Sequence, residues 1–386
     1  MKHLKHLVIT QDMCSLPWLH AEINLQNNLI RPCCKFEGSL GTVQEEFAVT
    51  WYNKKFTDLR SNMQAGKIID ECSACHVPKN VFSYKKWKNN TYRNMMSIDV
   101  DTPIMPKVFH FGLKNICNLA CRMCDPRASS KLHQLTSKSE ILKKYFPFQV
   151  TDNNFNIENL RGSFANAEHV TFAGGEPLID EDCLSLIKII KQESNKIRSV
   201  NFSTNMTRLN HELLKELSEM KGKIMLSVSI DGPPNIQEYI RHKCNWNDIL
   251  NNLQYIRKNY PNIILAINTT VSILNIGHIT ESLDMFHKLE NTLSIKIHHL
   301  MISPVIDKTF LHPSILPSYT KELYLDKLLK YNNACTIPES KDLIPTAIKM
   351  LNETPNSTMQ EFDEYISEFD RLAGTDYKLI YPEFLQ

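Results

Sequence analysis

The 386-residue sequence has no run of about eighteen apolar residues, the length that a helix needs to cross a membrane. The apolar run within residues 1–10 is too short for a signal peptide, so we expect none. Neither charge is in excess: 44 Lys and Arg face 42 Asp and Glu, so the net charge is +2. We therefore expect a cytoplasmic protein with no membrane partner and without the basic surface that general nucleic-acid binding requires.

Cysteine, in contrast, is plentiful, with eleven residues in a chain whose composition is that of a folded globular protein. A reducing compartment keeps thiols free, so this number favours metal ligation over disulfides. The cysteines form an amino-terminal group, a central group and a scattered remainder: Cys14, Cys33, Cys34, Cys72 and Cys75; Cys117, Cys121 and Cys124; and Cys183, Cys244 and Cys335. We expect Cys183, which lies in an apolar helical pattern, to be a buried core thiol rather than a catalytic one.

The central group has the spacing C-x3-C-x2-C and directly follows the apolar run of residues 108–113. This placement predicts three thiolates on the loop that leaves a β-strand. Zinc sites more often use paired C-x2-C units, whereas three closely spaced cysteines leave an iron–sulfur cluster one ligand short. About fifty residues further on, a second apolar strand ends in Gly-Gly-Glu-Pro at residues 174–177, where the glycines let a ligand approach the backbone closely.

Together these two segments resemble the radical S-adenosylmethionine (SAM) superfamily. The resemblance implies that Cys117, Cys121 and Cys124 hold three irons of a [4Fe-4S] cluster and that SAM binds the fourth. It also implies a cradle for the methionine end of SAM, formed by Gly174, Gly175, Glu176 and Pro177. The superfamily usually has an aromatic residue just before the third cysteine, packed on adenine. Here Met123 takes that place, and its thioether can also cover a flat ring.

From residue 107 onward, strand-like runs alternate with helical patterns, which predicts an α/β fold with a parallel sheet. Six strands are expected, at residues 108–113, 169–173, 199–204, 224–230, 263–272 and 293–301. The helices between them are expected at residues 129–145, 181–193, 210–220, 246–259 and 279–289. Six such units are two fewer than in a full eight-stranded barrel, and they agree with the partial (β/α)6 barrel of the superfamily that the sequence resembles.

In such folds ligands gather at the carboxyl ends of the strands, where the cysteine loop and the glycine segment both lie. Polar residues at the ends of other strands are therefore further candidates to bind SAM: Asn205, Ser227, Ser229, Asp231 and Asn268. Ser227 and Ser229 share one face of their strand, and small hydroxyl side chains there leave room for a ribose. Asp231 is equally typical of a turn, and the two asparagines could instead complete hydrogen bonds within the barrel.

The amino-terminal cysteines surround a predicted β-hairpin over residues 19–33, and a helix is expected near residues 56–64. One cysteine before the hairpin, one after it and the later C-x2-C pair make four thiolates, enough for a [4Fe-4S] cluster or for zinc. We assign these ligands as Cys14, Cys33, Cys72 and Cys75, with Cys34 as the alternative to Cys33. Adjacent side chains in a strand point to opposite faces, so we expect the cysteine of that pair that does not reach the metal to be buried.

Cys-x2-Pro-Trp at residues 14–18, Pro-Cys-Cys at residues 32–34 and Arg60 before the C-x2-C pair resemble the SPASM/Twitch auxiliary-cluster module of radical SAM enzymes. With the ending at residues 369–383, the pattern is similar to Twitch-domain radical SAM proteins. The resemblance implies an auxiliary-cluster domain at residues 1–100, a radical SAM partial barrel at 101–305 and a helical extension packed on the barrel at 306–386. The module typically follows the barrel, whereas here it precedes it.

The resemblance implies an enzyme that cleaves SAM reductively, with an electron from an external reductant of the flavodoxin or ferredoxin type. The resulting 5′-deoxyadenosyl radical abstracts a hydrogen atom from the substrate. SPASM/Twitch enzymes often modify peptides, so the leading substrate is a peptide or protein side chain, and the runner-up is a small polar metabolite such as a nucleoside or sugar derivative. A third reading is a non-enzymatic zinc module that recognises RNA. The sequence does not indicate which residue acts on the substrate.

Overall fold

The computed structural model describes residues 14–44, 46–75, 103–147, 150, 155–293, 296–304, 308–335 and 340–385, and for 296–304 and 340–342 it describes only the course of the backbone. Both expected domain boundaries, at residues 100/101 and 305/306, lie outside these ranges. So do residues 1–13, 45 and 76–100 of the expected amino-terminal domain.

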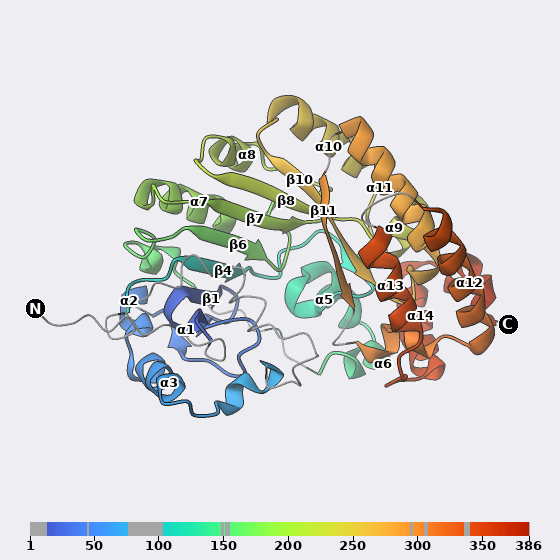
Figure 1. Cartoon of the computed structure of the whole chain (residues 1–386), viewed down its shortest axis with the longest axis horizontal. Coiled ribbons are helices and arrows are strands. Elements are labelled where there is room, and N and C mark those ends of the chain that lie inside the picture. Colours follow the sequence, from blue (N-terminus) through green and yellow to red (C-terminus); the bar gives the residue numbers. More distant parts are fainter. Residues whose placement is uncertain are drawn as a thin grey trace, which may run out of the picture.

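The predicted α/β fold with a parallel sheet is confirmed. Six parallel strands lie in the order β11-β10-β8-β7-β6-β4 (Figure 1). In chain order they are β4 (Val108–Gly112), β6 (His169–Ala173), β7 (Ser199–Thr204), β8 (Lys223–Ser229), β10 (Ile264–Val271) and β11 (Lys296–Pro304). Because neighbouring strands are parallel, the carboxyl ends of all six lie at the same edge of the sheet. The loops that follow the strands therefore meet at that edge.

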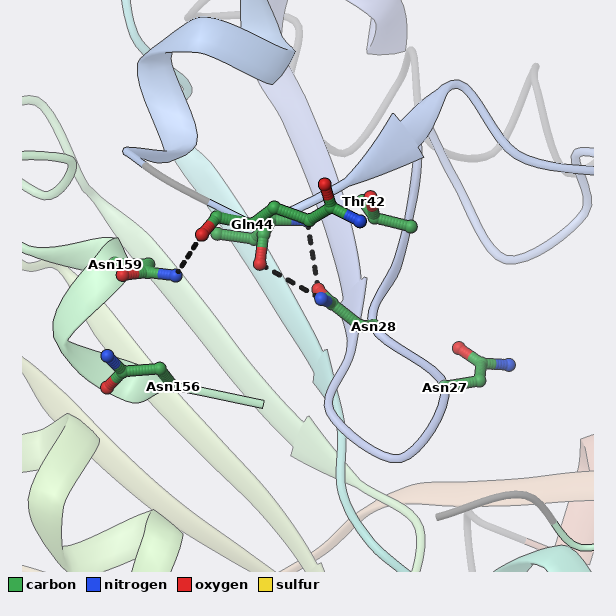
Figure 2. A pocket seen from close by; sticks show the side chains of 7 residues that line it. Asn27, Asn28, Thr42, Gln44, Asn156 and Asn159 are labelled. Carbon is green, nitrogen blue, oxygen red and sulfur yellow. Dashed lines mark hydrogen bonds between the residues drawn. The ribbon is translucent and has the colours of Figure 1, made fainter. Parts of the chain in front are cut away.

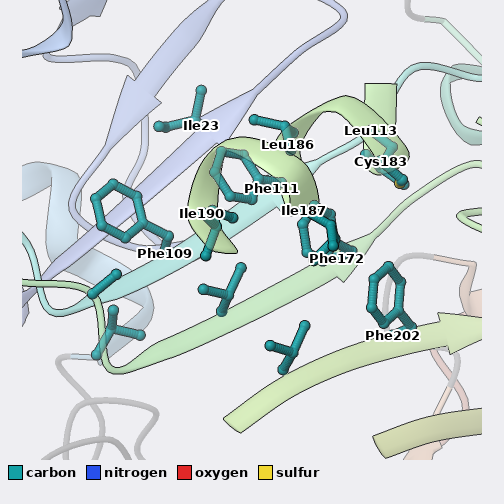
Figure 3. Close-up of a cluster of buried hydrophobic side chains, with 14 of the residues drawn as sticks. Ile23, Phe109, Phe111, Leu113, Phe172, Cys183, Leu186, Ile187, Ile190 and Phe202 are labelled. Carbon is teal, nitrogen blue, oxygen red and sulfur yellow. The ribbon is translucent and has the colours of Figure 1, made fainter. Parts of the chain in front are cut away.

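Four helices follow these strands and cover one face of the sheet: α7 (Glu181–Glu193), α8 (His211–Ser218), α10 (Trp246–Asn259) and α11 (Ile279–Leu293). The buried positions of α7 recur at the helical spacing of three and four residues: Cys183, Leu186, Ile187 and Ile190. Figure 3 shows this stripe packed on Phe111 and Phe172, whose ring centroids lie 5.2 Å apart. Cys183 is completely buried, as predicted for a core thiol.

Two predicted elements differ from those observed. The helix expected over residues 129–145 is two helices, α5 (Ser130–Thr136) and α6 (Glu140–Lys144), because the side chain of Ser139 accepts the backbone N–H of Leu142 and starts a new helix. The last strand begins three residues later than expected, since α11 continues to Leu293 before β11 starts at Lys296.

The amino-terminal region adds three strands to the same sheet. The predicted hairpin is confirmed as β1 (His20–Asn24) and β2 (Leu29–Arg31), followed by β3 (Gly41–Thr42). β1 pairs with β4 in parallel over its whole length, which makes the sheet nine-stranded. Its helices are α1 (Leu16–Leu19), α2 (Phe47–Trp51), α3 (Lys54–Gln64) and the 3-10 turn η1 (Asp70–Cys75). The sequence did not reveal that the hairpin covers the edge of β4.

The carboxyl-terminal region is helical and shares a second hydrophobic core with the loops after the strands. Its helices are α12 (Ser318–Ala334), α13 (Ser340–Leu351), α14 (Met359–Ala373) and α15 (Tyr377–Ile380). They lie beside α6 and α9 (Pro234–Ile240) at one end of the molecule (Figure 1). The short 3-10 turns are η3 (Pro126–Ala128), η4 (Ile157–Leu160), η5 (Ile276–His278), η6 (Thr309–Leu311), η7 (Pro313–Ile315) and η8 (Pro382–Leu385).

Among the described residues, no helix has both the length and the apolar character that a membrane span requires. All eleven cysteines lie in the described ranges, and no disulfide joins any two of them.

Candidate functional site

The cysteine loop and the glycine segment leave adjacent strands at the same edge of the sheet. β4 ends at Gly112, whose register partner on β6 is Ala173. The backbone N–H of Leu113 then donates to the carbonyl of Ala173 at 2.8 Å, so the two loops start side by side. Parallel pairing therefore brings together two motifs that are about fifty residues apart in the sequence.

The three cysteines of this loop pack into one small cluster. Cys117 and Cys121 are buried with Leu119 between them, and Met123, Cys124 and Cys244 pack against these three. Within the described ranges, no three His, Cys, Asp or Glu side chains are arranged as ligands of a single metal ion. Cysteine thiolates are the usual ligands of [4Fe-4S] clusters, so the three neighbouring thiols provide donors of the type that such a cluster needs.

Serine side chains and a short β-pairing hold the loop in shape. The hydroxyl of Ser130 donates to the carbonyl of Cys117 at 3.1 Å, and that of Ser129 donates to the carbonyl of Leu119 at 2.5 Å. β5 (Ala120–Cys121) pairs antiparallel with β9 (Arg241–His242), which places Cys121 opposite Arg241. The loop is thus fixed from the helix that follows it and from the segment after α9.

Burial makes these thiols poor acids in the absence of a bound cation. It raises the pKa of Cys117 to about 11, and the carboxylate of Glu176 raises it further. Burial also raises the pKa of Cys121 and of Cys124, while the charge of Arg241 lowers the first and that of Lys308 lowers the second. Metal binding requires thiolates, so a bound cluster and these two cations would act in the same direction.

Arg241 is a site residue that the sequence did not indicate. Its Nη1 atom lies 3.8 Å from the Sγ atom of Cys121, and its Nε donates to Asp231 at 2.7 Å. The other carboxylate oxygen of Asp231 accepts the backbone N–H of Thr270 at 2.8 Å, and the side chain is fully buried. Asp231, expected as a SAM contact or a turn residue, is in this structure the counterion of Arg241. Its contact with SAM stays a prediction.

The two glycines of the Gly-Gly-Glu-Pro segment allow a close approach of the cysteine loop itself. Both have positive φ angles, +85° at Gly174 and +51° at Gly175. A Cβ atom on Gly175 would lie 2.4 Å from the carbonyl oxygen of Lys114 and 2.8 Å from that of Ile116. The backbone N–H of Glu176 donates to the same Ile116 carbonyl at 2.7 Å. Close approach was expected for a ligand, and the structure shows it for the loop that carries Cys117.

The buried carboxylate of Glu176 ties this segment to the end of the next strand. It accepts the hydroxyl of Thr204 at 2.6 Å and the backbone N–H of Asn205 at 2.6 Å. Burial raises the pKa of Glu176 to about 7 despite these hydrogen bonds. The amide of Asn205 in turn donates to Asn118 at 3.0 Å and lies 3.9 Å from the Sγ atom of Cys117. The predicted residue Asn205 is therefore beside the cysteines.

Polar side chains line the inner face of the sheet at the same edge. Ser227 and Ser229 are both half-buried on the face of β8 that the helices do not cover. Asn268 is the register partner of Ser229 on β10, so these two predicted residues are neighbours. The Oδ1 atom of Asn268 is buried and has no hydrogen-bond partner in the described part of the chain. An unsatisfied acceptor on this face fits a site that binds a polar ligand.

Residues 113–293 match the family model described as Radical SAM superfamily. This segment is a radical SAM domain. It contains all three cysteines of the central loop, the glycine segment and the five other predicted SAM contacts on the strand ends.

Solved structures that match this chain include SuiB of Streptococcus suis bound to S-adenosylmethionine, at 14% identity and a TM-score of 0.35, covering 64% of this chain and 51% of that one. Native anSMEcpe with bound AdoMet has 18% identity and a TM-score of 0.38, and covers 58% of this chain and 59% of that one. SuiB bound to its precursor peptide SuiA has 13% identity and a TM-score of 0.37, over 75% and 61% of the two chains. This chain therefore spans less than two thirds of the length of each. No curated protein matches it.

Outside the radical SAM domain, the structure brings two of the amino-terminal cysteine segments together. The backbone N–H of Glu37, just after Cys33 and Cys34, donates to the carbonyl of Glu71 at 2.8 Å. The hydroxyl of Ser73 donates to the Glu37 carboxylate at 2.6 Å. The segment that carries Cys72 and Cys75 thus lies against the loop that follows the hairpin.

The exposures of the adjacent cysteines differ, as opposite orientations require. Cys33 is buried, and Cys34 is exposed. Burial raises the pKa of Cys33, and a thiolate at Cys14 raises it further. Cys14 packs against the hydrophobic core that contains Cys33. We expected the cysteine of this pair that is not the ligand to be buried. This holds if Cys34 is the ligand and fails if Cys33 is, because the chain turns directly after β2 and leaves Cys34 exposed.

A polar cavity of about 510 Å³ lies at the tip of the hairpin. The described residues that line it carry no charged side chain, and they are Asn27, Asn28, Thr42, Val43, Gln44, Asn156 and Asn159 (Figure 2). The Asn28 amide is already engaged, since its Nδ2 donates to the Val43 carbonyl at 2.9 Å and its Oδ1 accepts the Val43 N–H at 2.9 Å. Asn159 donates to the Gln44 carbonyl at 3.1 Å and joins η4 to the hairpin side of the cavity.

Proposed function

We propose that this protein binds a [4Fe-4S] cluster through Cys117, Cys121 and Cys124, binds SAM beside it, and abstracts a hydrogen atom from a peptide or protein side chain. The observation that carries the proposal is the meeting of the cysteine loop, the Gly174–Pro177 segment and the polar strand ends at one edge of the sheet. When bound, the cluster and SAM supply a 5′-deoxyadenosyl radical by one-electron reduction, with the electron coming from a flavodoxin or ferredoxin type of reductant.

The chain's own residues would bind and orient SAM. We assign Gly174, Gly175, Glu176 and Pro177 to the methionine end, because this segment packs directly on the cysteine loop. The half-buried hydroxyls of Ser227 and Ser229 and the unsatisfied amide oxygen of Asn268 are assigned to the ribose. Asn205 and Asp231 complete the assignment as residues that shape the site around Cys117 and Arg241.

Met123 is assigned to the adenine end of SAM. It packs against the cysteine cluster and also against the second hydrophobic core that the carboxyl-terminal helices form. Its thioether therefore lies at the junction between the cluster site and an apolar wall. Apolar packing on that side limits the access of water to the site. A radical reaction requires this exclusion of water.

A second [4Fe-4S] cluster on Cys14, Cys33, Cys72 and Cys75 is the proposed auxiliary centre. The hydrogen bonds between the Glu37 and Glu71 segments support it, because they bring the loop after Cys33 and Cys34 to the segment of Cys72 and Cys75. The alternative is zinc in the same four thiolates, because ligand type and number suit both metals. The proposed location is the cytoplasm, where a reducing environment keeps these thiols available.

The proposed substrate is a peptide or protein segment, and the alternative is a small polar metabolite such as a nucleoside or sugar derivative. The uncharged carboxamide lining of the cavity in Figure 2 offers both donors and acceptors, which suits a neutral chain of backbone amides and equally a sugar. A non-enzymatic zinc module for RNA is not retained, because residues 113–293 form a radical SAM domain.

Anaerobic reconstitution with iron and sulfide, followed by reduction with dithionite in the presence of SAM, tests the proposal. The parent protein should form 5′-deoxyadenosine, and a Cys117→Ala/Cys121→Ala/Cys124→Ala variant should form none. Cys335→Ala, a single thiol outside both groups, is the control and should behave as the parent. Undiminished 5′-deoxyadenosine from the triple variant would refute the assignment. Two clusters predict about eight irons per chain, whereas about four irons with one zinc would assign zinc to the amino-terminal site.

A further inference from the structure

A buried side chain of the cysteine loop, Arg122, contacts the carboxyl-terminal helix α14. This residue lies between Cys121 and Met123 and is completely buried. Its guanidinium lies over the ring of Tyr239 at 3.7 Å and over that of Phe369, on α14, at 4.6 Å. The loop that carries the cysteines is therefore anchored in the second hydrophobic core. Part of this core comes from α14, which follows residues 113–293 of the radical SAM domain.

Asp370 on α14 provides the counterion of this arginine. Its Oδ1 accepts from Nη2 of Arg122 and from the hydroxyl of Thr375 at 2.7 Å. Its Oδ2 accepts the hydroxyl of Tyr239 at 2.9 Å and the backbone N–H of Tyr377 at 2.6 Å. Both acceptor oxygens of a buried carboxylate are thus satisfied by four donors, of which one comes from the cysteine loop.

The backbone of Arg122 is held from two sides as well. Its N–H donates to the carbonyl of Ile240 at 2.9 Å, and its carbonyl accepts the hydroxyl of Tyr365, also on α14, at 2.7 Å. Nη2 of the guanidinium additionally donates to Thr375 at 2.6 Å. Side chain and main chain at the position next to Cys121 are therefore both fixed, and most of the partners lie in residues 365–377.

We propose that Asp370 is a positioning residue for the cluster, which holds Arg122 and thereby sets the places of Cys121 and Cys124. The proposal rests on the proposed function of the cysteine loop. It assigns a role to the carboxyl-terminal ending that resembles Twitch-domain proteins. The physical reason is that a loop outside the sheet has few contacts of its own, and a buried arginine tolerates only the geometry in which its counterion is present.

The test must separate positioning from plain stability. Asp370→Asn keeps the shape of the side chain and removes its charge. Arg122→Met/Asp370→Leu replaces the buried ion pair by apolar side chains, which often restores stability. Tyr365→Phe removes a single hydrogen bond to the loop. The matched control is Glu364→Gln on the same helix, whose carboxylate pairs with Lys144 on α6 at 3.3 Å in a partly exposed position.

Three measurements are made on each reconstituted protein: the rate of iron loss to a chelator, the EPR spectrum of the reduced cluster with and without SAM, and thermal unfolding of the metal-free chain. If Asp370 positions the cluster, Asp370→Asn loses iron at least about tenfold faster, in the range typical of changes just outside a metal's ligands. The double variant should recover thermal stability while its SAM-dependent EPR change stays altered. Tyr365→Phe should increase the rate of iron loss by less than Asp370→Asn does. Glu364→Gln should leave the rate of iron loss and the EPR spectrum unchanged.

Other outcomes overturn the proposal. If the double variant regains the parental EPR spectrum and chelator rate together with its stability, the ion pair only stabilises the fold. Equal spectra and rates in the parent and Asp370→Asn lead to the same conclusion. A parent protein that binds no iron after reconstitution would refute the proposed function and this inference together, so the two failures are distinguishable.

Discussion

The Nη1 atom of Arg241 lies 3.8 Å from the Sγ atom of Cys121, at the point where β9 pairs with β5. The same guanidinium is the partner of Asp231, whose side chain is completely buried. A change of Arg241 therefore affects two groups at once, since it removes a positive charge from the thiols and leaves a buried carboxylate unpaired.

We expect Arg241→Gln to lower the free energy of unfolding by about 3–5 kcal/mol, the usual cost of breaking a buried ion pair from one side. Arg198→Gln is the matched control. The side chain of Arg198 is 66% exposed where it pairs with Glu168. Without it, Glu168 still has Lys107 as an ion-pair partner. The control should cost no more than about 1 kcal/mol. Urea unfolding of the metal-free chains measures both, and equal losses would contradict the importance of burial here.

Gly175→Ala should disrupt the contact between the glycine segment and the cysteine loop. The new Cβ would overlap the backbone carbonyls of Lys114 and Ile116. A change of side-chain rotamer cannot relieve this overlap, because both atoms belong to the main chain. Gly162→Ala is the control, because Gly162 also has a positive φ of +78° but has nothing within 4 Å of a new Cβ. It should cost about 1 kcal/mol from backbone strain alone.

The Gly175 variant should cost a further 1–3 kcal/mol or so from the overlap and should retain less iron in the barrel site. Thermal unfolding and iron analysis of the two variants test this. Similar losses in both variants would mean that the left-handed backbone conformation, rather than the close approach, explains the glycine.

The stability of the protein should depend on the protonation of Asp180, which caps the start of α7. Burial raises the pKa of Asp180 to about 6, and its Oδ2 has no hydrogen-bond partner among the described residues. Between about pH 4 and pH 6 the folded chain keeps a proton that the unfolded chain has lost, so the contribution of this group to stability falls as the pH rises through that window. Above it, the penalty for a buried charge is constant.

Asp180→Asn keeps the cap, because Asn accepts the same backbone N–H, and removes the charge. We expect it to stabilise the protein by roughly 1–3 kcal/mol at pH 7.5 and to have little effect near pH 4. Asp376→Asn, at the exposed cap of α15, is the control and should show no such pH dependence. An Asp180→Asn gain that is the same at both pH values would contradict this account.

Replacing Cys72 and Cys75 by Ala should leave SAM cleavage without substrate intact but abolish product formation. SAM needs only the site at the edge of the barrel sheet, whereas the amino-terminal strands extend that sheet beside β4. A metal site in so small a segment also supports its folding, so circular dichroism and protease sensitivity must match the parent. A well-folded double variant that forms product at the parental rate would show that the amino-terminal site is structural or incidental.

Local pattern in the sequence was sufficient to predict the six parallel strands, the helices α7 and α10, the hairpin and the burial of Cys183. These features depend on periodicity, capping residues and turns, all of which act over a few neighbouring residues. The spacing of Cys117, Cys121 and Cys124 likewise indicated the cluster loop, because one short segment carries all the ligands. The pair Cys33 and Cys34 shows the limit of this reasoning, since which of the two is exposed depends on where the chain turns after β2.

Contacts between distant segments could not be predicted in this way. The partner of Arg122 is 248 residues away and that of Cys121 is 120 residues away, and nothing in the local sequence of either loop specifies Asp370 or Arg241. The pairing of β1 with β4 is of the same kind, because an apolar strand indicates that it needs a neighbour without indicating which one. Burial makes these contacts important for stability, because a charged arginine or carboxylate that is removed from water is stable only beside its partner.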